Sequence, residues 1–129
     1  MGDMNRRNAA GAGLAIALLV AGAAHSAQGY PERPVRMIVP YSAGGASDIV
    51  MRIVAQKLPE FLGQPVVVDN RPGAGGLIGT DTVAKSSPDG YTLLATSTPH
   101  VILPHLHKKI PFDALQDFAP IMQFGDQPY

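Results

Sequence analysis

The sequence predicts an α/β fold in which a parallel sheet is covered by helices on both faces. Three short apolar runs, typical of buried strands, alternate with two stretches that carry apolar residues at helical spacing. The order strand, helix, strand, helix, strand requires crossover connections, which are right-handed and join parallel strands. The 129 residues suit one modest domain and leave little room for a second.

The first predicted strand covers residues 35–39, VRMIV, and Pro40 ends it. A helix is expected from position 49 to position 62, because apolar residues recur there at intervals of three and four. Pro59 should either kink this helix or begin a fresh turn, and Gly63 is a natural end. The residues expected to face the sheet as core are Ile49, Val50, Ile53, Val54, Leu58, Phe61 and Leu62.

Two further strands follow, at residues 66–68 and 91–96, with a shorter helix expected over 77–85 between them. In parallel sheets, ligands bind beyond the carboxyl ends of the strands, where the connecting loops gather. The loops that lie at this edge are residues 41–48, 70–76 and 97–100.

The first thirty residues differ in composition from the rest. A basic head at positions 5–8, NRRN, precedes a run of small and aliphatic residues at 9–24, after which cleavage is possible behind Ser26 or Gly29. This pattern predicts a secretory signal peptide over residues 1–26, since sixteen mostly Ala and Gly residues are too few to cross a membrane well. The protein is therefore expected to be exported.

Charge and cysteine content exclude several classes of protein. Ten basic and ten acidic side chains cancel, so no basic surface predicts nucleic-acid binding. The chain has no cysteine, so no disulfide framework supports it, and an ordinary hydrophobic core must do so.

Two of the three loops share one arrangement, in which a strand leads through glycines into a helix. They read YSAGGASD at 41–48 and NRPGAGG at 70–76. Helix starts carry unpaired amide hydrogens and partial positive charge, and glycines let a ligand approach the backbone. Two such openings at one edge favour a shared anion-binding pocket, although two plain turns stay the alternative.

Individual side chains near these loops have more than one possible role. Ser47 or Asp48 could cap the first helix. Tyr41 either contacts the ligand or closes the core. Arg71 is a possible carboxylate contact, although arginines in turns are more often solvated.

Other site chemistries have less support. A dinucleotide fingerprint that begins at Gly73 would need a glycine where Ile78 stands, and no P-loop lysine is present. Ser42 and Ser47 lack the glycine-flanked elbow of a hydrolase nucleophile, yet an exported serine hydrolase stays an alternative because triads assemble from distant residues. The histidines show no metal-binding motif, so neither a metal nor a cofactor is expected.

Three segments resemble the Bug family of periplasmic solute-binding proteins, the extracytoplasmic receptors of tripartite tricarboxylate transporters. They are YPERPVRMIVPYSAGGASDIVMR at 30–52, LGQPVVVDNRPGAGGLIGTDTVAKSSPDGYTLL at 62–94 and KKIPFDALQDFAPI at 108–121. NRPGAGG at 70–76 is the most specific of these marks.

The resemblance implies a two-lobed periplasmic receptor that closes around a small carboxylate and passes it to membrane permease subunits. The ligand is held by backbone amides and ordered waters, so its identity stays open among di- and tricarboxylates, amino acids and aromatic acids. The expected contacts, with Tyr41, are Ser42, Ala43, Gly44, Gly45, Asp48, Gly73, Ala74, Gly75, Gly76, Ser97 and Thr98.

Members of this family are more than twice as long as this chain. Residues 30–129 are therefore expected to form only the N-terminal part of the first lobe, in a truncated receptor with weak or no affinity of its own. A secreted interaction domain whose glycine loops are plain turns is the remaining alternative.

Overall fold

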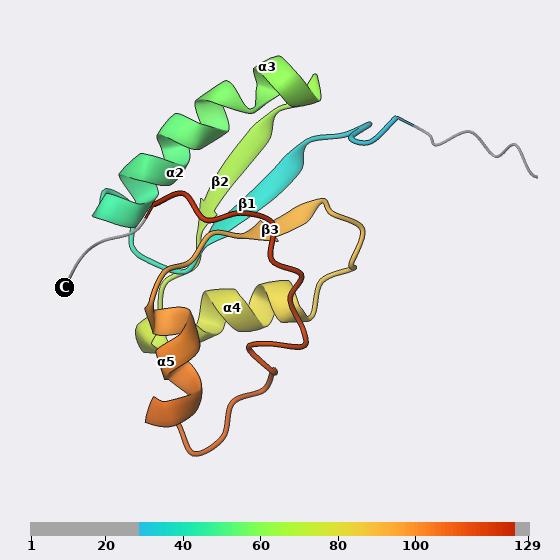
Figure 1. Cartoon of the computed structure of the whole chain (residues 1–129). Helices are drawn as coiled ribbons and strands as arrows, with labels where there is room; N and C mark the ends of the chain where they lie inside the picture. The colour runs from blue at the N-terminus through green and yellow to red at the C-terminus, as the bar shows by residue number, and fades with distance from the viewer. Residues whose placement is uncertain (1–28, 126–129) are drawn as a thin grey trace, which may run out of the picture. The chain divides into compact units, whose positions relative to one another are not determined.

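The computed structural model describes residues 29–125, so the predicted signal peptide at 1–26 lies outside the described residues. The chain divides into units 1–30 and 31–129, and the fold is that of the second unit. The elements, labelled in Figure 1, are β1 (Val35–Val39), α2 (Ala46–Lys57), α3 (Pro59–Leu62), β2 (Val66–Asn70), the 3-10 helix η2 (Ala74–Gly76), α4 (Leu77–Ala84), β3 (Thr92–Leu94) and α5 (Pro99–Leu106). The predicted alternation of strands and helices is confirmed.

The three strands form a parallel sheet, as the sequence predicts, and their order in it is β2-β1-β3. Met37 at the middle of β1 lies opposite Val68 on β2 and Leu93 on β3. Because β1 has a neighbour on each side, its residues are the most deeply buried, and Val35 and Val39 are fully excluded from solvent.

Helices cover the two faces of the sheet, α2 with α3 on one side and α4 on the other (Figure 1). α2 contacts β1 and β2, whereas α4 contacts β1 and β3. The chain thus leaves β1 toward one face and reaches β3 across the opposite face, which makes the carboxyl ends of β1 and β3 a topological switch point.

The core on the α2 side is built from Met37, Val39, Met51 and Ala95. On the α4 side, Gly79 lets the helix approach the end of β1 closely. A Cβ atom added at Gly79 would lie 2.7 Å from the Pro40 Cβ atom and 2.8 Å from the Arg71 carbonyl oxygen. The start of α4 is therefore fixed beneath the end of β1 at a distance that only glycine permits.

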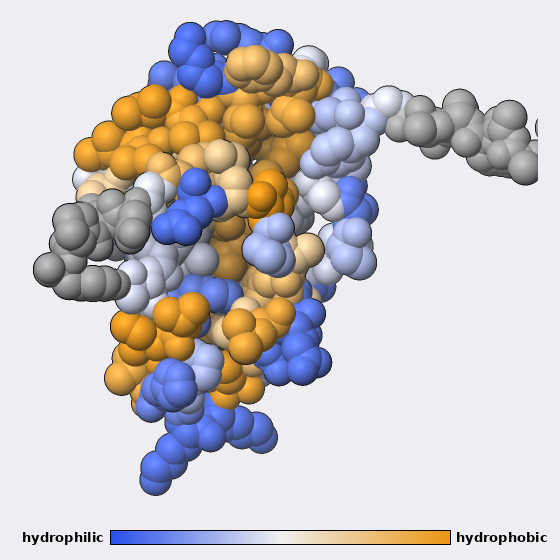
Figure 2. All heavy atoms as spheres, in the orientation of Figure 1, coloured by the Kyte–Doolittle hydropathy of each residue, from blue (hydrophilic) through white to orange (hydrophobic). Residues whose placement is uncertain are grey.

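The predicted core face of the first helix is wrong in part. Ile49, Val50, Ile53 and Phe61 are 53%, 46%, 59% and 82% exposed. The face turned to the sheet instead carries residues at positions 48, 51 and 55, which are also spaced by three and four. Figure 2 accordingly shows apolar surface gathered where Figure 1 places α2 and α3.

Several boundaries differ from the predicted ones. The first helix begins at Ala46, and Pro59 begins the separate turn α3, which Gly63 ends with a φ of 68°. β3 covers only Thr92–Leu94, and α5 continues through Pro104, which removes one helical hydrogen bond without ending the helix. No helix within residues 29–125 combines the length and the hydropathy needed to cross a membrane.

Candidate ligand-binding site

The three loops predicted to form a site do lie at one edge of the sheet, and specific side chains join them. The Tyr41 hydroxyl group lies 3.2 Å from Ser97 Oγ and 3.3 Å from Thr96 Oγ1, which links the loop after β1 to the loop after β3. The ring of Tyr41 also packs against the core, so the side chain fills the core and contacts the third loop.

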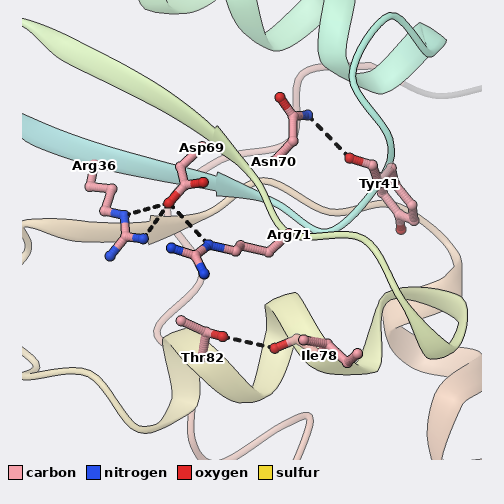
Figure 3. A network of polar contacts seen from close by, with 7 residues as sticks. All are labelled: Arg36, Tyr41, Asp69, Asn70, Arg71, Ile78 and Thr82. Carbon is pink, nitrogen blue, oxygen red and sulfur yellow. Dashed lines mark hydrogen bonds and ion pairs between the residues drawn. The ribbon is translucent and has the colours of Figure 1, made fainter.

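Asn70, the last residue of β2, links the first loop to the second (Figure 3). Its Nδ2 atom donates to the Tyr41 carbonyl oxygen at 3.1 Å and to Asp48 Oδ1 at 3.0 Å. Its Oδ1 atom accepts from the Arg52 guanidinium at 2.9 Å. One amide side chain thus holds the first loop, the start of α2 and the end of β2 together.

Asp48 is the buried charge at the centre of this arrangement, with only 2% of its surface exposed. Asp48 Oδ2 accepts from the Gly44 amide at 2.7 Å and from Arg52 Nε at 2.9 Å. The Arg52 hydrogen bond, with those from Gly44 and Asn70, lowers the pKa of Asp48 to about 2. Asp48 is therefore ionised at neutral pH, and both of its oxygens are occupied within the protein.

Neither Ser47 nor Asp48 caps the first helix, contrary to the prediction. Gly45 occupies the N-cap position and has no side chain that could cap the helix. Asp48 lies in the first turn, and its carboxylate accepts from the Gly44 amide. The carboxylate thereby tightens the glycine turn and lies near the positive end of the helix dipole.

Backbone amides are the groups that this edge offers to a ligand. Within residues 29–125, the amides of Ala46, Ser47 and Asp48 at the start of α2 have no acceptor, and neither do those of Ala74 and Gly75 in the second loop. The Gly44 and Gly45 amides are already used, by Asp48 and by the Ser42 carbonyl oxygen. The arrangement can therefore bind an anion through two sets of amides.

The exposure of the predicted contacts shows an open site. Ser42, Ala43, Gly44, Gly45, Ala74, Gly75, Ser97 and Thr98 are exposed, Tyr41 and Gly73 are half-buried, and Asp48 and Gly76 are buried. The second loop combines Ala74 and three glycines with positive φ, between 48° and 134°, which turns successive amides away from the strand.

Sequence reasoning missed the roles of Arg52 and Asn70. The spacing of Asp48 and Arg52, four positions apart on a helix, was the available signal for the ion pair between them. Nothing local indicated that Asn70 would join them. Arg71, considered as a carboxylate contact, instead places its Nε atom 3.2 Å from Asp69 Oδ2.

The structure shows no arrangement of histidine side chains that would support a serine hydrolase or a metal site within the described residues. His100 Nε2 lies 3.0 Å from the Ala114 carbonyl oxygen, and the ring packs edge-on against Phe118. Among residues 29–125, no histidine side chain is hydrogen-bonded to a serine side chain, and no cluster of three metal-ligating side chains is present.

One prediction concerns the conformation of the first loop. Gly44 has a φ of 80°, which an alanine adopts only with strain. We expect Gly44→Ala to lower the free energy of unfolding by about 1 kcal/mol, measured by urea denaturation. Gly44→Asn should cost less, because asparagine tolerates this conformation; equal losses for both variants would show that the backbone conformation is not the cause.

Comparison with known proteins gives a consistent match. The model of the tripartite tricarboxylate transporter family receptor matches residues 50–129. Protein BugT of Bordetella pertussis is 48% identical over 118 residues, which make up 90% of this chain and 36% of that protein. The chain thus spans about a third of the length of this relative.

Solved structures agree with the fold. A structure described as a periplasmic transporter is 44% identical with a TM-score of 0.64, over 67% of this chain and 30% of that one. A TctC solute binding protein from Polaromonas is 38% identical with a TM-score of 0.58, over 63% of this chain and 29% of that one.

Proposed function

This chain belongs to the tripartite tricarboxylate transporter receptor family, and from that premise we propose that its loops bind a small organic carboxylate outside the cytoplasm. The ligand would be passed on to membrane permease subunits of a tripartite transporter. The matching family is described as a receptor family, and the two solved structures are named a periplasmic transporter and a TctC solute binding protein, which supports a periplasmic and non-enzymatic role.

The observation that carries the proposal is that two glycine loops with unpaired amides follow neighbouring parallel strands, β1 and β2, at one edge of the sheet. The amides of Ala46 to Asp48 and those of Ala74 and Gly75 come from loops that Asn70 and Gly79 hold in place. Amides that are fixed before the ligand arrives lose little conformational freedom on binding, and an anion is the ligand that they favour.

The electrostatics of the first loop support the same conclusion. A bare carboxylate at position 48 would repel an anionic ligand, but Arg52 pairs with it at 2.9 Å. The charge of Asp48 is thus balanced within the protein, so we propose that its carboxylate orients the turn while its backbone amide stays available to the ligand. We propose Asp48 and Asn70 as positioning residues.

Beside the amides of Ala46 to Asp48, the contact residues that we propose are loop positions, most of them exposed, together with the half-buried Tyr41 and Gly73 and the buried Gly76. They are Tyr41, Ser42, Ala43, Gly44, Gly45, Gly73, Ala74, Gly75, Gly76, Ser97 and Thr98. Because the edge is open, these loops provide one wall of a site, and a single wall predicts weak binding.

A titration followed by two-dimensional NMR tests this function. Isotope-labelled chain would be titrated with succinate, citrate, glutamate and benzoate, with 1,4-butanediol as an uncharged control. We expect at least one acid to shift the amide signals of Ala46, Ser47 and Ala74 saturably, with a dissociation constant in roughly the millimolar range. The diol should shift none of them. Failure of every acid to shift these amides, or chemical conversion of an acid during the titration, would contradict the proposal.

A further inference from the structure

A cationic feature adjoins the second loop, on the face of the sheet that carries α4. Residues alternate along β2, so Asn70 points toward α2 whereas Asp69 points to the opposite face (Figure 3). There Arg36 from β1 and Arg71 from the segment after β2 both donate to Asp69 Oδ2. We call these three residues the Arg36–Asp69–Arg71 cluster.

The cluster carries more positive charge than its single carboxylate can balance. Two guanidinium groups face one acid, and within residues 29–125 neither forms an ion pair with any other carboxylate. Each guanidinium has five N–H donors, yet only three of the ten are used, all on Asp69 Oδ2. A net charge of plus one therefore remains, with N–H groups able to donate to another carboxylate.

The surroundings of the cluster are open and partly apolar. The side chains of Arg36, Asp69 and Arg71 are 42%, 27% and 49% exposed, and neighbouring Val67 is 52% exposed. α4 contacts β1 and β3, and β2 lies at the edge of the three-stranded sheet. A shallow hollow along this region is lined in part by Arg36, Val67 and Asp69.

This geometry suits a protein better than a small free acid. Half-exposed ion pairs contribute little by themselves, because water and salt screen them. A polypeptide that lies along β2 can add hydrogen bonds to the strand edge and cover Val67, and it can present a carboxylate to the two arginines. A small acid gains only the charge contact.

We propose that the Arg36–Asp69–Arg71 cluster is a docking site for an extended segment of a partner protein that carries an acidic side chain beside an aliphatic one. The proposal does not rest on the proposed ligand function, because the cluster uses the side chains of Arg36 and Asp69 on the α4 face and that of Arg71 from the second loop, and none of the loop amides.

Peptide titrations against the isotope-labelled full chain test the proposal. The probes are acetyl-Val-Glu-Val-Glu-Val-amide, the same peptide with Gln in place of Glu, and free glutarate. We expect the acidic peptide to shift the amide signals of Val67 and Asp69 saturably. The Gln peptide should need at least roughly tenfold higher concentration, the ratio typical of losing a charge-assisted contact. Glutarate at the same concentration should leave these signals unmoved.

Variants assign the effect to the cluster. Arg71→Gln keeps the Arg36–Asp69 pair and should weaken the acidic peptide several-fold without unfolding the chain, as signal dispersion in the same spectra will show. Arg33→Gln is the matched control, because Arg33 also pairs with an aspartate, Asp89, at 3.0 Å. Equal binding of both peptides, an equal loss in Arg33→Gln, or equal shifts from glutarate would each overturn the proposal.

Discussion

Replacing Gly79 by alanine is expected to destabilise the fold by about 2–3 kcal/mol, because the added methyl group has no room. It would lie 2.7 Å from the Pro40 Cβ atom, 2.8 Å from the Arg71 carbonyl oxygen and 2.9 Å from the Pro40 Cα atom. These neighbours belong to the backbone or to a rigid ring, so a rotamer change cannot relieve the contact. The helix must move away from β1 instead.

The expected sign of the stability change distinguishes a steric clash at Gly79 from an effect of helix propensity. In an unobstructed helix, Gly→Ala stabilises by about 1 kcal/mol because alanine has the higher helix propensity. Urea denaturation of Gly79→Ala should show the opposite sign, whereas Gly125→Ala, where no atom of the described residues lies within 4 Å of an added Cβ atom, should change little. Unchanged or higher stability in Gly79→Ala would show that α4 does not approach β1 as closely as the structure has it.

The contact at Gly79 also shows what the sequence could not predict. The apolar runs and the turn residues predict β1, β2 and β3 and their parallel direction, because periodicity and turn chemistry are local properties. The close approach of α4 to Pro40 and Arg71 depends on residues that lie apart in the chain. Nothing in the segment 77–85 distinguishes Gly79 from an ordinary helical glycine.

The rotation of α2 shows a second limit of sequence reasoning. Positions 49, 50 and 53 and positions 48, 51 and 55 both follow a helical period, and the more apolar set was predicted to be core. The structure buries the second set, which includes Asp48. The reason is tertiary: Arg52 and Asn70 satisfy the Asp48 carboxylate, so a charge can occupy a position that the pattern assigns to an apolar residue.

Some features of the candidate site could likewise be predicted from the sequence, and others could not. The glycine loops and their helix starts could be predicted, since strand, turn and helix follow one another in the sequence. The side chains that hold the loops together could not, because Tyr41 meets Ser97 and Asn70 meets Asp48 only after the sheet has formed.

Replacing Asp48 by asparagine is expected to lower stability at neutral pH and to loosen the first loop. Asp48 Oδ2 accepts from both Gly44 and Arg52, and Oδ1 accepts from Asn70. An asparagine amide has one acceptor and two donors, so at least one donor would face another donor in a buried position. Arg52 would also lose its charge partner.

The pH dependence of stability identifies the contribution of the carboxylate. Its pKa is lowered from 3.8 to about 2 in the folded protein, so the charged form stabilises the fold fully above the unfolded pKa. That stabilisation should disappear as the pH falls from about 4 to about 2. The asparagine variant cannot titrate at this position, so the stability of the unmodified chain should fall toward that of the variant over the same interval.

Urea midpoints of both proteins at pH 7, 4, 3 and 2 measure this difference. Asp69 and Asp113, whose pKa values are also lowered by hydrogen bonds, are present in both proteins, so the difference between them isolates Asp48. Asp81→Asn is the matched control, because Asp81 pairs with Lys85 at the same helical spacing but with a more exposed side chain.

A stability difference between Asp48→Asn and the unmodified chain that stays constant from pH 7 to pH 2 would mean that the carboxylate charge does not hold the loop. A difference that narrows only for Asp48→Asn would mean that the charged carboxylate, paired with Arg52, stabilises the fold at this position.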